Sequence, residues 1–313
     1  MTTGAALRDL AASGDPRAQL RLAHLILIGR ERSFAPNQAM QLLNAACAQR
    51  HGDALLYHAT LALRGIGRPK SHDEALALLK DAAAAGDTRA KGQLQALGGK
   101  IDRDVWWGPV HTEQHHDSPR VFTIRNFIPA PACNWLIKYG RKNLQRAAIQ
   151  DAAKNGAFVV DDARTNSVAP TSILQHDLVI QLTNMRIAAM TGIPIAQQEA
   201  TNILHYARGQ QYAPHFDFIR EHEEAGFAHE LRSMGQRVLT FLIYLNDDYE
   251  GGETAFPLLN WSFKGKAGDA LMFWNLSAAG EREQLSLHAG TPVTKGEKWL
   301  LSKWMRQRPV PPT

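Results

Sequence analysis

The sequence predicts an α+β protein of two domains, an N-terminal α-solenoid of helical hairpins and a C-terminal jelly roll, or double-stranded β-helix, with supporting helices. Three observations lead to this prediction. The first hundred residues repeat with a fixed period, short strand-like segments dominate after about residue 118, and 313 residues suffice for two hydrophobic cores. We expect a helical domain at 1–97, a linker at 98–117 and a β domain at 118–313.

The composition is typical of a soluble globular protein, with 44% hydrophobic and 21% charged residues. No apolar run reaches the ~20 residues that a membrane span requires. The first residues lack the basic start and apolar stretch of a signal peptide. Cys47 and Cys133 are the two cysteines, too few for a disulfide framework. We therefore expect a cytoplasmic protein that does not enter a membrane.

The net charge of +5 is concentrated in the helical region. Residues 1–96 contain 12 basic and 8 acidic residues, whereas the remainder contains 23 and 22. A solvated surface is one interpretation of this excess, and an acidic partner is the other. No block of like charge or basic–aromatic stripe indicates a nucleic-acid surface, so nucleic acid is not an expected partner.

An internal repeat of 36 residues defines the helical region. Each unit predicts two amphipathic helices, because apolar residues recur three and four apart and glycines follow them. A fixed period of this length is typical of stacked hairpins. The matching positions are Ala18, Ala54 and Ala90; Ala23 and Ala59; Leu25 and Leu61; Gly29 and Gly65; Ala39 and Ala75; Leu42 and Leu78; Ala46 and Ala82.

This pattern resembles Sel1-like repeats, which are relatives of the tetratricopeptide repeat. The resemblance covers about residues 12–97, with two full units and a last helix that begins near Gly86. It implies an α-solenoid used for protein contacts, and it implies no catalytic chemistry. Arrays of this kind stack neighbouring units to bury a continuous core.

The second region reads as strands supported by two helices. RVFTIRNFIP, at 120–129, alternates in the manner of a half-buried strand. ACNWLIKYGRKNLQ and LVIQLTNMRIAAMTG then predict helices. After Pro194 we expect the strands TNILHY, RVLTFLIYLN, ETAFP, DALMFWN and GEKWLLSKWMRQ. Short strands separated by glycine and proline favour a barrel or jelly roll.

The segment YAPHFDF contains a candidate pair of metal ligands, His215 and Asp217. Residues two apart on a strand face the same side, so both side chains would point to one place. Of the downstream histidines, His222 and His229 lie in a charged, loop-like segment. His288 follows four strands and would return beside the pair. Two histidines and one carboxylate are the ligands of non-haem Fe(II) oxygenases, and zinc is the alternative metal.

The same pair has a simpler interpretation as polar surface residues. The chain has another HxD pattern, His115-His116-Asp117, in the predicted linker, where no third ligand is expected. A histidine and an aspartate at this spacing are therefore weak evidence until further residues support them.

Lys298 supplies a second signal, because it lies in the apolar strand KWLLSKW. Burying a lysine is costly unless an anion neutralises it. That anion is either a protein carboxylate or one end of a dicarboxylic cosubstrate whose other end chelates the metal. 2-Oxoglutarate is a cosubstrate of this kind.

The motifs of the second domain, in order, resemble those of the prolyl 4-hydroxylase catalytic domain, from the Fe(II)- and 2-oxoglutarate-dependent dioxygenases. They are LHYARGQQYAPHFDF, RVLTFLIYLN, GGETAFP, GDALMFWN and LHAGTPVTKGEKWLLSKW, and the resemblance covers about residues 119–308. NFIPAPACNWLI is similar to the opening of that domain. AGEREQL, before Ser286, departs from the family pattern. The lack of a recognisable secretion signal is closer to the bacterial members.

The resemblance implies specific roles for residues of this chain. The metal ligands would be His215, Asp217 and His288. The contacts to the cosubstrate would be Tyr206, Thr254 and Lys298. Arg237 and Trp304 would lie near the substrate groove. For Tyr206, Arg237 and Trp304, packing within the barrel is the alternative. The segment 220–236 falls where the family carries a mobile loop over the active site.

The function implied by the resemblance is hydroxylation of a prolyl residue in a protein or peptide. Fe(II) would be bound, 2-oxoglutarate and O2 would be consumed, and succinate and CO2 would be released. Ascorbate would keep the iron reduced. The carboxylate of Asp217 favours hydroxylation over halogenation. A small-molecule substrate, a metal enzyme that ignores 2-oxoglutarate, and a repeat scaffold with an idle oxygenase domain are the alternatives. The helical repeats could recruit a protein substrate.

Overall fold

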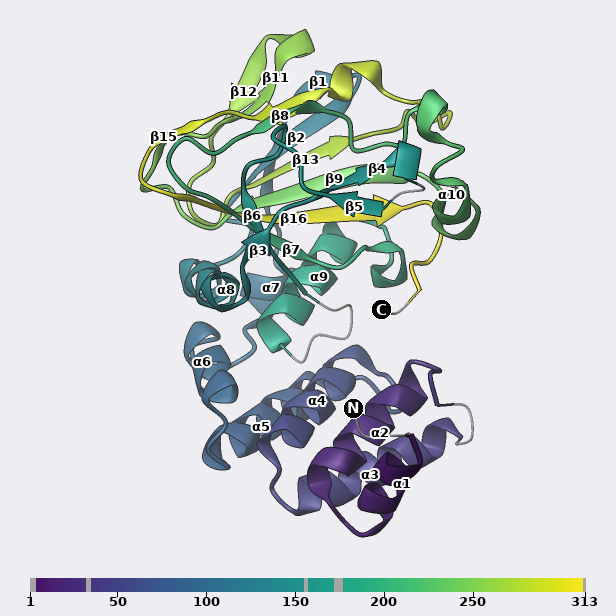
Figure 1. Ribbon diagram of the computed structural model, residues 1–313. Coiled ribbons are helices and arrows are strands. Elements are labelled where there is room, and N and C mark those ends of the chain that lie inside the picture. The colour runs from purple at the N-terminus through teal and green to yellow at the C-terminus, as the bar shows by residue number, and fades with distance from the viewer. Residues whose placement is uncertain (1–3, 32–34, 155–156, 172–176, 312–313) are drawn as a thin grey trace. The chain divides into compact units, whose positions relative to one another are not determined.

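The computed structural model describes residues 4–31, 35–154, 157–171 and 177–311. The chain divides into two compact units, one of residues 1–103 with 174–182, the other of residues 104–173 with 183–311. Figure 1 shows the helices of the first unit and the strands of the second. The predicted fold class, a helical region followed by a sheet-rich domain, is confirmed. Among the described residues, no helix is long and apolar enough to cross a membrane.

The described residues between 4 and 96 form six helices in sequence, and each packs on the next. Their bounds are α1 Gly4–Ala12, α2 Pro16–Leu27, α3 Pro36–Ala48, α4 Gly52–Arg64, α5 His72–Ala84 and α6 Thr88–Ala96. Helices α2, α4 and α6 begin 36 residues apart, and so do α3 and α5, which confirms the repeat. Helix α1 was not predicted; it adds Leu7 and Ala11 to the core at the end of the array.

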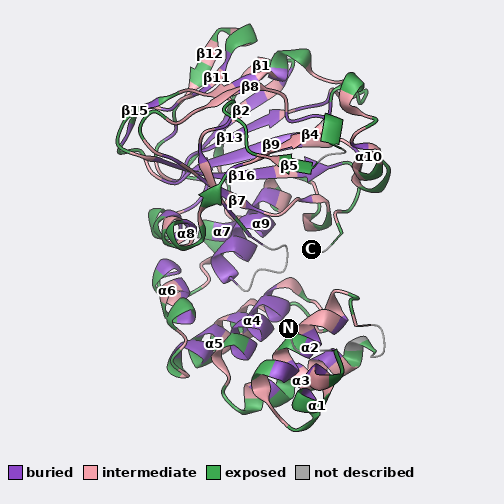
Figure 2. Ribbon diagram, viewed as in Figure 1, coloured by how far each residue is buried: buried purple, intermediate pink, exposed green. Residues whose placement is uncertain are grey.

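The alanines that define the repeat form the helix contacts. Ala23, Ala39, Ala46, Ala54 and Ala90 are almost completely buried. A small side chain at these positions lets neighbouring helices approach closely, and the leucines between them fill the remaining space. Figure 2 shows α4 buried along most of its length.

The second unit is built on an eight-stranded sheet of order β1-β2-β13-β9-β16-β7-β6-β3, opposite a four-stranded sheet of order β12-β11-β14-β8. Leucine and aromatic side chains of both sheets form one core cluster. The strands of the large sheet are β1 His111–Asp117, β2 Arg120–Arg125, β13 Ala270–Trp274, β9 Arg237–Tyr244, β16 Lys298–Arg306, β7 Asn202–Tyr206, β6 Ser167–Pro170 and β3 Gln145–Arg146. Those of the small sheet are β12 Trp261–Phe263, β11 Thr254–Phe256, β14 His288–Gly290 and β8 Tyr212–His215.

Two short pairs form separate two-stranded sheets: β4 Ile149–Asp151 with β5 Ala157–Val159, and β10 Glu250–Gly251 with β15 Val293–Lys295. Helices α8 Ala130–Asn143 and α9 Leu178–Thr191 confirm the two predicted helices. Helix α8 packs on β6 and β7.

The predicted linker was wrong in part. Residues 111–117 form β1, which pairs with β2, and α7 (Arg103–Trp107) precedes it. The sequence HTEQHHD hid this strand because β1 lies at the edge of the sheet and most of its side chains are exposed. Strands β3 to β6 were also missed, because they are short and carry little alternation.

Candidate metal centre

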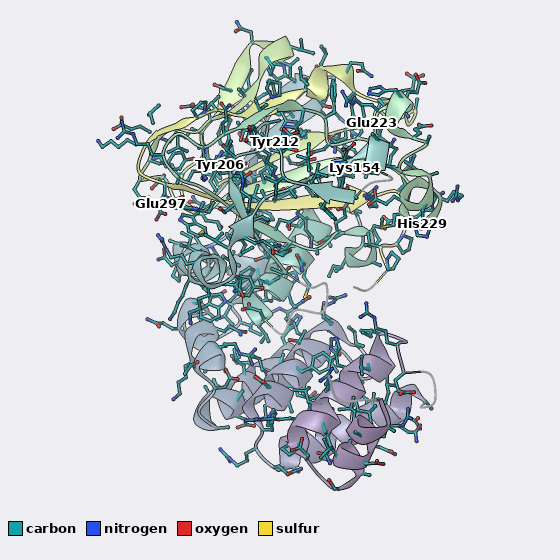
Figure 3. The ribbon with its side chains drawn as sticks, in the orientation of Figure 1. Lys154, Tyr206, Tyr212, Glu223, His229 and Glu297 are labelled. Carbon is teal, nitrogen blue, oxygen red and sulfur yellow. The ribbon has the colours of Figure 1, made fainter. Side chains whose placement is uncertain are left out.

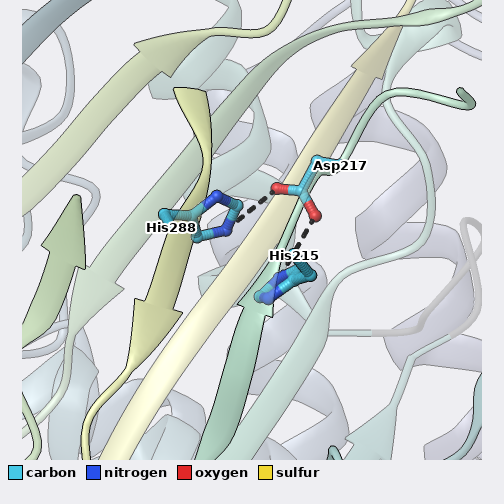
Figure 4. Close-up of side chains that lie close together, drawn as sticks. All are labelled: His215, Asp217 and His288. Carbon is cyan, nitrogen blue, oxygen red and sulfur yellow. Dashed lines mark ion pairs between the residues drawn. The ribbon is translucent and has the colours of Figure 1, made fainter. Parts of the chain in front are cut away.

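Two neighbouring strands of the small sheet bring the predicted ligands together. His215 ends β8 and lies directly opposite His288, the first residue of β14. Asp217 follows two residues after His215. One nitrogen or carboxylate oxygen from each of the three side chains lies within 4.8 Å of the others, as Figure 4 shows. The Nε2 atoms of His215 and His288 are 3.7 Å and 3.5 Å from the carboxylate oxygens of Asp217.

Both imidazoles are oriented by backbone carbonyls. His215 Nδ1 donates to the carbonyl oxygen of Ala213 at 2.8 Å, and His288 Nδ1 donates to that of Ser286 at 3.0 Å. A proton held on Nδ1 leaves Nε2 with a free lone pair, which is the tautomer of a metal-ligating histidine. The two lone pairs therefore face the carboxylate, and the donor set fits a divalent transition metal.

Burial and mutual charge favour the protonation states that a metal requires. Burial, with the neighbouring His288, lowers the pKa of His215 to about 3, so its ring is neutral near pH 7. Burial alone would raise the pKa of Asp217, but His288, His215 and the Thr240 hydroxyl together hold it below its ordinary value. An ionised carboxylate and a neutral imidazole are thus present without any proton having to leave.

A buried hydrogen-bond chain supports Asp217 from behind. Thr240 Oγ1 donates to Asp217 Oδ2 at 2.6 Å, and Asn275 Nδ2 donates to Thr240 Oγ1 at 2.9 Å. Both supporting side chains are almost fully buried. Thr240 occupies one lone pair of Oδ2, so Oδ1 is the oxygen more open to a metal, and Thr240 fixes which way the carboxylate turns. Sequence reasoning missed Thr240 and Asn275, because nothing in TFL or FWN marks a contact to a distant aspartate.

Tyr212, which the sequence left unassigned, stacks on one metal ligand. Its ring centroid lies 3.5 Å from that of His215, with an interplanar angle of 16°. The guanidinium of Arg164 lies 4.8 Å from the Tyr212 ring centroid and is held by the Asn166 side chain and the Ala148 carbonyl. Sequence reasoning missed Arg164, because it lies between the recognised domain opening and the motif that begins at Leu204, outside both. Figure 3 shows Tyr212 and Tyr206 in the interior of the barrel.

Lys298 lies fully inside the barrel, with 1% of its surface exposed. Its Nζ donates to the carbonyl oxygen of Gly252 at 2.7 Å. Among the described residues, no carboxylate lies within ion-pair distance, so an internal salt bridge does not explain this lysine. Burial lowers its pKa to about 7, and the charge of Glu253 opposes the shift. A small anion in the adjacent cavity would restore the full positive charge.

Tyr206 and Thr254 lie beside Lys298. Tyr206 pairs with Lys298 across β7 and β16, and its ring centroid is 5.2 Å from Nζ. Burial raises the pKa of Tyr206 to about 12, so its hydroxyl remains a donor. Thr254 Oγ1 is 2.8 Å from Tyr244 Oη. One cavity is lined by these three predicted cosubstrate contacts and by the three predicted metal ligands.

Arg237 and Trp304 line a groove that adjoins the cavity of the metal donors, and Asp217 and Trp304 belong to the lining of both. The Arg237 guanidinium binds both oxygens of Glu199, at 2.7 Å and 3.2 Å, and lies 4.0 Å from the Trp304 ring centroid. Arg306 also donates to Glu199. Arg237 is therefore already neutralised by a protein carboxylate. The contact between Arg237 and Trp304 is part of the packing of the barrel and also forms one wall of the groove.

The histidines judged to be loop residues lie apart from the metal ligands. His222 is in a 3₁₀ turn at Glu221–Glu223, and His229 is on α10 (Ala228–Met234). Both are exposed. Figure 3 shows His229 at the outer edge of the domain. The segment predicted as a loop over the active site thus contains a short helix.

Comparison with known proteins first gives the class. The 2OG-Fe(II) oxygenase superfamily profile matches residues 201–306. "Prolyl 4-hydroxylase 1" of Arabidopsis thaliana is 35% identical over 215 residues, covering 64% of this chain and 74% of that protein. "Prolyl 4-hydroxylase subunit alpha-1" of Rattus norvegicus is 34% identical over 200 residues, 64% of this chain and 37% of that protein. The chain belongs to the prolyl 4-hydroxylase family of the 2OG-Fe(II) oxygenases.

Two solved structures are also similar. The viral collagen prolyl hydroxylase of Paramecium Bursaria Chlorella virus-1 aligns with a TM-score of 0.48 and 24% identity, covering 59% of this chain and 95% of that one. A Sel1 repeat protein from Oxalobacter formigenes aligns with a TM-score of 0.27 and 25% identity, covering 29% and 71%. The family implies Fe(II), 2-oxoglutarate and O2, and the histidine and aspartate donors described above fit this metal.

Proposed function

We propose that this protein is a 2-oxoglutarate-dependent hydroxylase that acts on a prolyl residue of a protein or peptide. One observation carries the proposal: the three clustered metal donors share a cavity with a buried lysine that forms no ion pair with any carboxylate of the described residues. A chelating dicarboxylate joins these two features, since one end needs a metal and the other needs a cation. The curated relatives that match are prolyl 4-hydroxylases, which supports a prolyl residue as the target.

The chain's own residues have distinct roles in this reaction. His215 and His288 would hold iron through Nε2, and Asp217 through Oδ1. Lys298 would bind the far carboxylate of 2-oxoglutarate, with the Tyr206 hydroxyl as a second donor. When bound, iron, 2-oxoglutarate and O2 supply the oxidation of a C–H bond, with succinate and CO2 as co-products. The buried walls exclude water from this step.

The groove beside Asp217 suits an extended peptide. Arg164, Arg237 and Trp304 line it together with Tyr212 and the exposed side chain of Phe158 on β5. Aromatic walls of this kind bind proline-containing segments, whose backbone is already extended and loses little entropy. Because the groove borders Asp217, a bound prolyl ring would lie next to the metal donors.

Turnover measurements test this function. The protein should form succinate from 2-oxoglutarate with added Fe(II), faster in the presence of proline-containing peptides, and mass spectrometry should find one added oxygen on proline. His215→Ala should abolish both, whereas His229→Ala, an exposed histidine outside the groove, should change neither. Succinate formation that free proline stimulates and peptides do not would contradict the peptide substrate. Succinate formation that survives His215→Ala would contradict the metal site.

We also propose that ascorbate sustains turnover and that the protein works in the cytoplasm. Two free cysteines support the cytoplasmic location.

We further propose that the helical repeats bind the protein that carries the target proline. A stacked array with no catalytic cluster among its described residues supports this role. Deleting residues 1–97 should raise KM for a whole protein substrate and leave KM for a short peptide unchanged. Equal effects on both substrates would contradict recruitment.

A further inference from the structure

A groove between α2 and α4 lies entirely within the helical repeats. Its walls come from one face of α2 and from the start of α4, and the two helices are in contact. Figure 1 shows both helices in the repeat unit. The lining residues are Arg17, Leu20, Arg21, His24, His51 and Asp53. None of them belongs to the metal centre or to the substrate groove.

The groove carries positive charge that the protein does not neutralise. Arg17 and Arg21 are exposed, and neither forms an ion pair or hydrogen bond within the described part of the chain. Asp53, the acidic residue of the groove, is paired with Arg89, which also binds Asp87 at 3.1 Å. Arg89 divides its single charge between Asp53 and Asp87, so Asp53 is neutralised only in part. Two arginines that have no ion pair among the described residues still outnumber this one carboxylate of the groove.

Comparison of equivalent positions in the repeat shows where a carboxylate has been replaced. The residue that caps α2 is Asp15, and the one that caps α6 is Asp87. At the equivalent position of α4 stands His51, whose Nδ1 accepts from the backbone of Ala54 at 3.3 Å. Aspartate is among the best N-cap residues, and histidine is not. Of these three equivalent N-cap positions, the one that lines the groove carries the less favourable capping residue.

His51 supplies a donor where aspartate would supply negative charge. Because Nδ1 accepts the capping hydrogen bond, the proton of the neutral ring is on Nε2. Burial and the charge of Arg17 lower the pKa of His51, against the smaller opposing effects of Asp15 and Asp87. A neutral N–H donor next to two guanidinium groups is an arrangement that recognises an acceptor, and an ionised aspartate there would oppose a bound anion.

We propose that this groove binds an acidic segment of another protein through Arg17, Arg21 and His51. Guanidinium groups bind carboxylates with two parallel hydrogen bonds, and Leu20 offers an apolar surface between them. Single exposed ion pairs are worth only about 0–1 kcal/mol each. Useful affinity therefore requires several carboxylates in succession, which a segment rich in glutamate or aspartate provides.

Fluorescence anisotropy with the full-length protein tests the proposal without iron or 2-oxoglutarate, so its failure would leave the hydroxylase function untouched. The probe is a fluorescein-labelled peptide with six glutamates separated by alanines, and the control peptide has glutamine in place of glutamate. The wild-type protein should bind the glutamate peptide at least about tenfold more tightly than the glutamine peptide. Raising the salt concentration should weaken this binding, because the pairs are exposed.

Substitutions locate the binding to the groove. Arg17→Gln with Arg21→Gln keeps residues that favour helix, and it should lower affinity for the glutamate peptide roughly tenfold. Lys70→Gln with Lys80→Gln removes the same charge from exposed positions outside the groove and should change affinity less than about twofold. Melting curves followed by circular dichroism check that both variants are folded.

Three results would overturn the proposal. The glutamine peptide would bind as well as the glutamate peptide, the two double variants would lose affinity equally, or a single-stranded oligonucleotide would bind more tightly than the glutamate peptide and depend on Arg17 and Arg21. Equal loss of affinity in the two double variants would mean that the peptide binds to surface charge in general and not to the groove. The third result would make nucleic acid the ligand.

Discussion

The two ends of β16 bury a cation each, and they do so in different ways. Lys298 begins the strand and Arg306 ends it, and each is 1% exposed. Arg306 donates to Glu199 and is 3.3 Å from a Glu230 oxygen. Lys298 has a backbone carbonyl as its partner and faces the cavity of the metal donors. A buried charge that the protein neutralises is structural, whereas one that it leaves without a counter-ion marks a ligand site.

Of the substitutions considered, Arg306→Met should have the largest effect, a loss of folding stability, because Arg306 has a structural role at its end of β16. Removing one partner of a buried ion pair typically costs ~3–5 kcal/mol of the free energy of unfolding. Here Glu199 keeps Arg237 while Glu230 loses a partner, so we expect a cost at the lower end, about 3 kcal/mol. Urea denaturation measures this change. Lys298→Met is the matched variant and should leave stability unchanged or raise it, because an uncompensated buried charge is removed. Equal destabilisation by the two substitutions would contradict the comparison.

Lys298→Met should instead weaken 2-oxoglutarate binding roughly a hundredfold, about 2.7 kcal/mol, because the far carboxylate loses its counter-ion. Calorimetric titration of the anaerobic Fe(II) protein measures this affinity. Arg306→Met, tested under conditions where it is folded, should bind 2-oxoglutarate with nearly the wild-type affinity. If Arg306→Met weakens 2-oxoglutarate binding more than Lys298→Met does, the assignment of the ligand site to the Lys298 end of β16 is wrong.

The pH dependence of this binding follows from the lowered pKa of Lys298, about 7 in the free protein. Above that pH the lysine loses its proton, so binding has to take one up. The dissociation constant of 2-oxoglutarate should therefore rise by up to about tenfold per pH unit above pH 7. The same lysine should make stability rise with pH between about 7 and its ordinary value of 10.5, because the unfolded chain holds the proton longer. Lys298→Arg, which stays charged, should abolish the pH dependence of binding, and a slope that survives would contradict its assignment to Lys298.

Thr240→Val should produce a smaller effect, at the metal itself. Without the hydroxyl, Oδ2 of Asp217 is no longer held, and supporting residues of this kind are worth about 10–100-fold in metal affinity. Competition with a fluorescent chelator measures this affinity without turnover. Thr240→Ser keeps the hydroxyl and should restore binding. Valine and serine variants with equal metal affinity would show that Thr240 serves packing alone.

The sequence predicted the parts of the site that lie in recognisable order along the chain. His215 and His288 lie on paired strands and Lys298 on β16, whereas Asp217 lies two residues beyond the end of β8, not on the strand that its spacing predicted. The structure brings all four around one cavity. The 36-residue repeat was visible because alanine at fixed positions is required for close helix packing.

The remaining features depend on contacts between distant segments, which no local pattern reveals. Thr240 donates to Asp217, and the pairing of β9 with β13 brings Asn275 within hydrogen-bond distance of Thr240. Glu199 lies in an unremarkable stretch, yet it neutralises both Arg237 and Arg306. The polar edge strand β1 carries no hydrophobic alternation, so it was taken for a linker.

Anomalous diffraction from a crystal loaded with Mn²⁺ and 2-oxoglutarate under anaerobic conditions tests the central claim most directly. The account predicts one strong peak at bonding distance from His215 Nε2, His288 Nε2 and Asp217 Oδ1. Density for the dicarboxylate should run from that peak to Lys298 Nζ. A peak elsewhere, or a dicarboxylate whose far end lies away from Lys298, would contradict it.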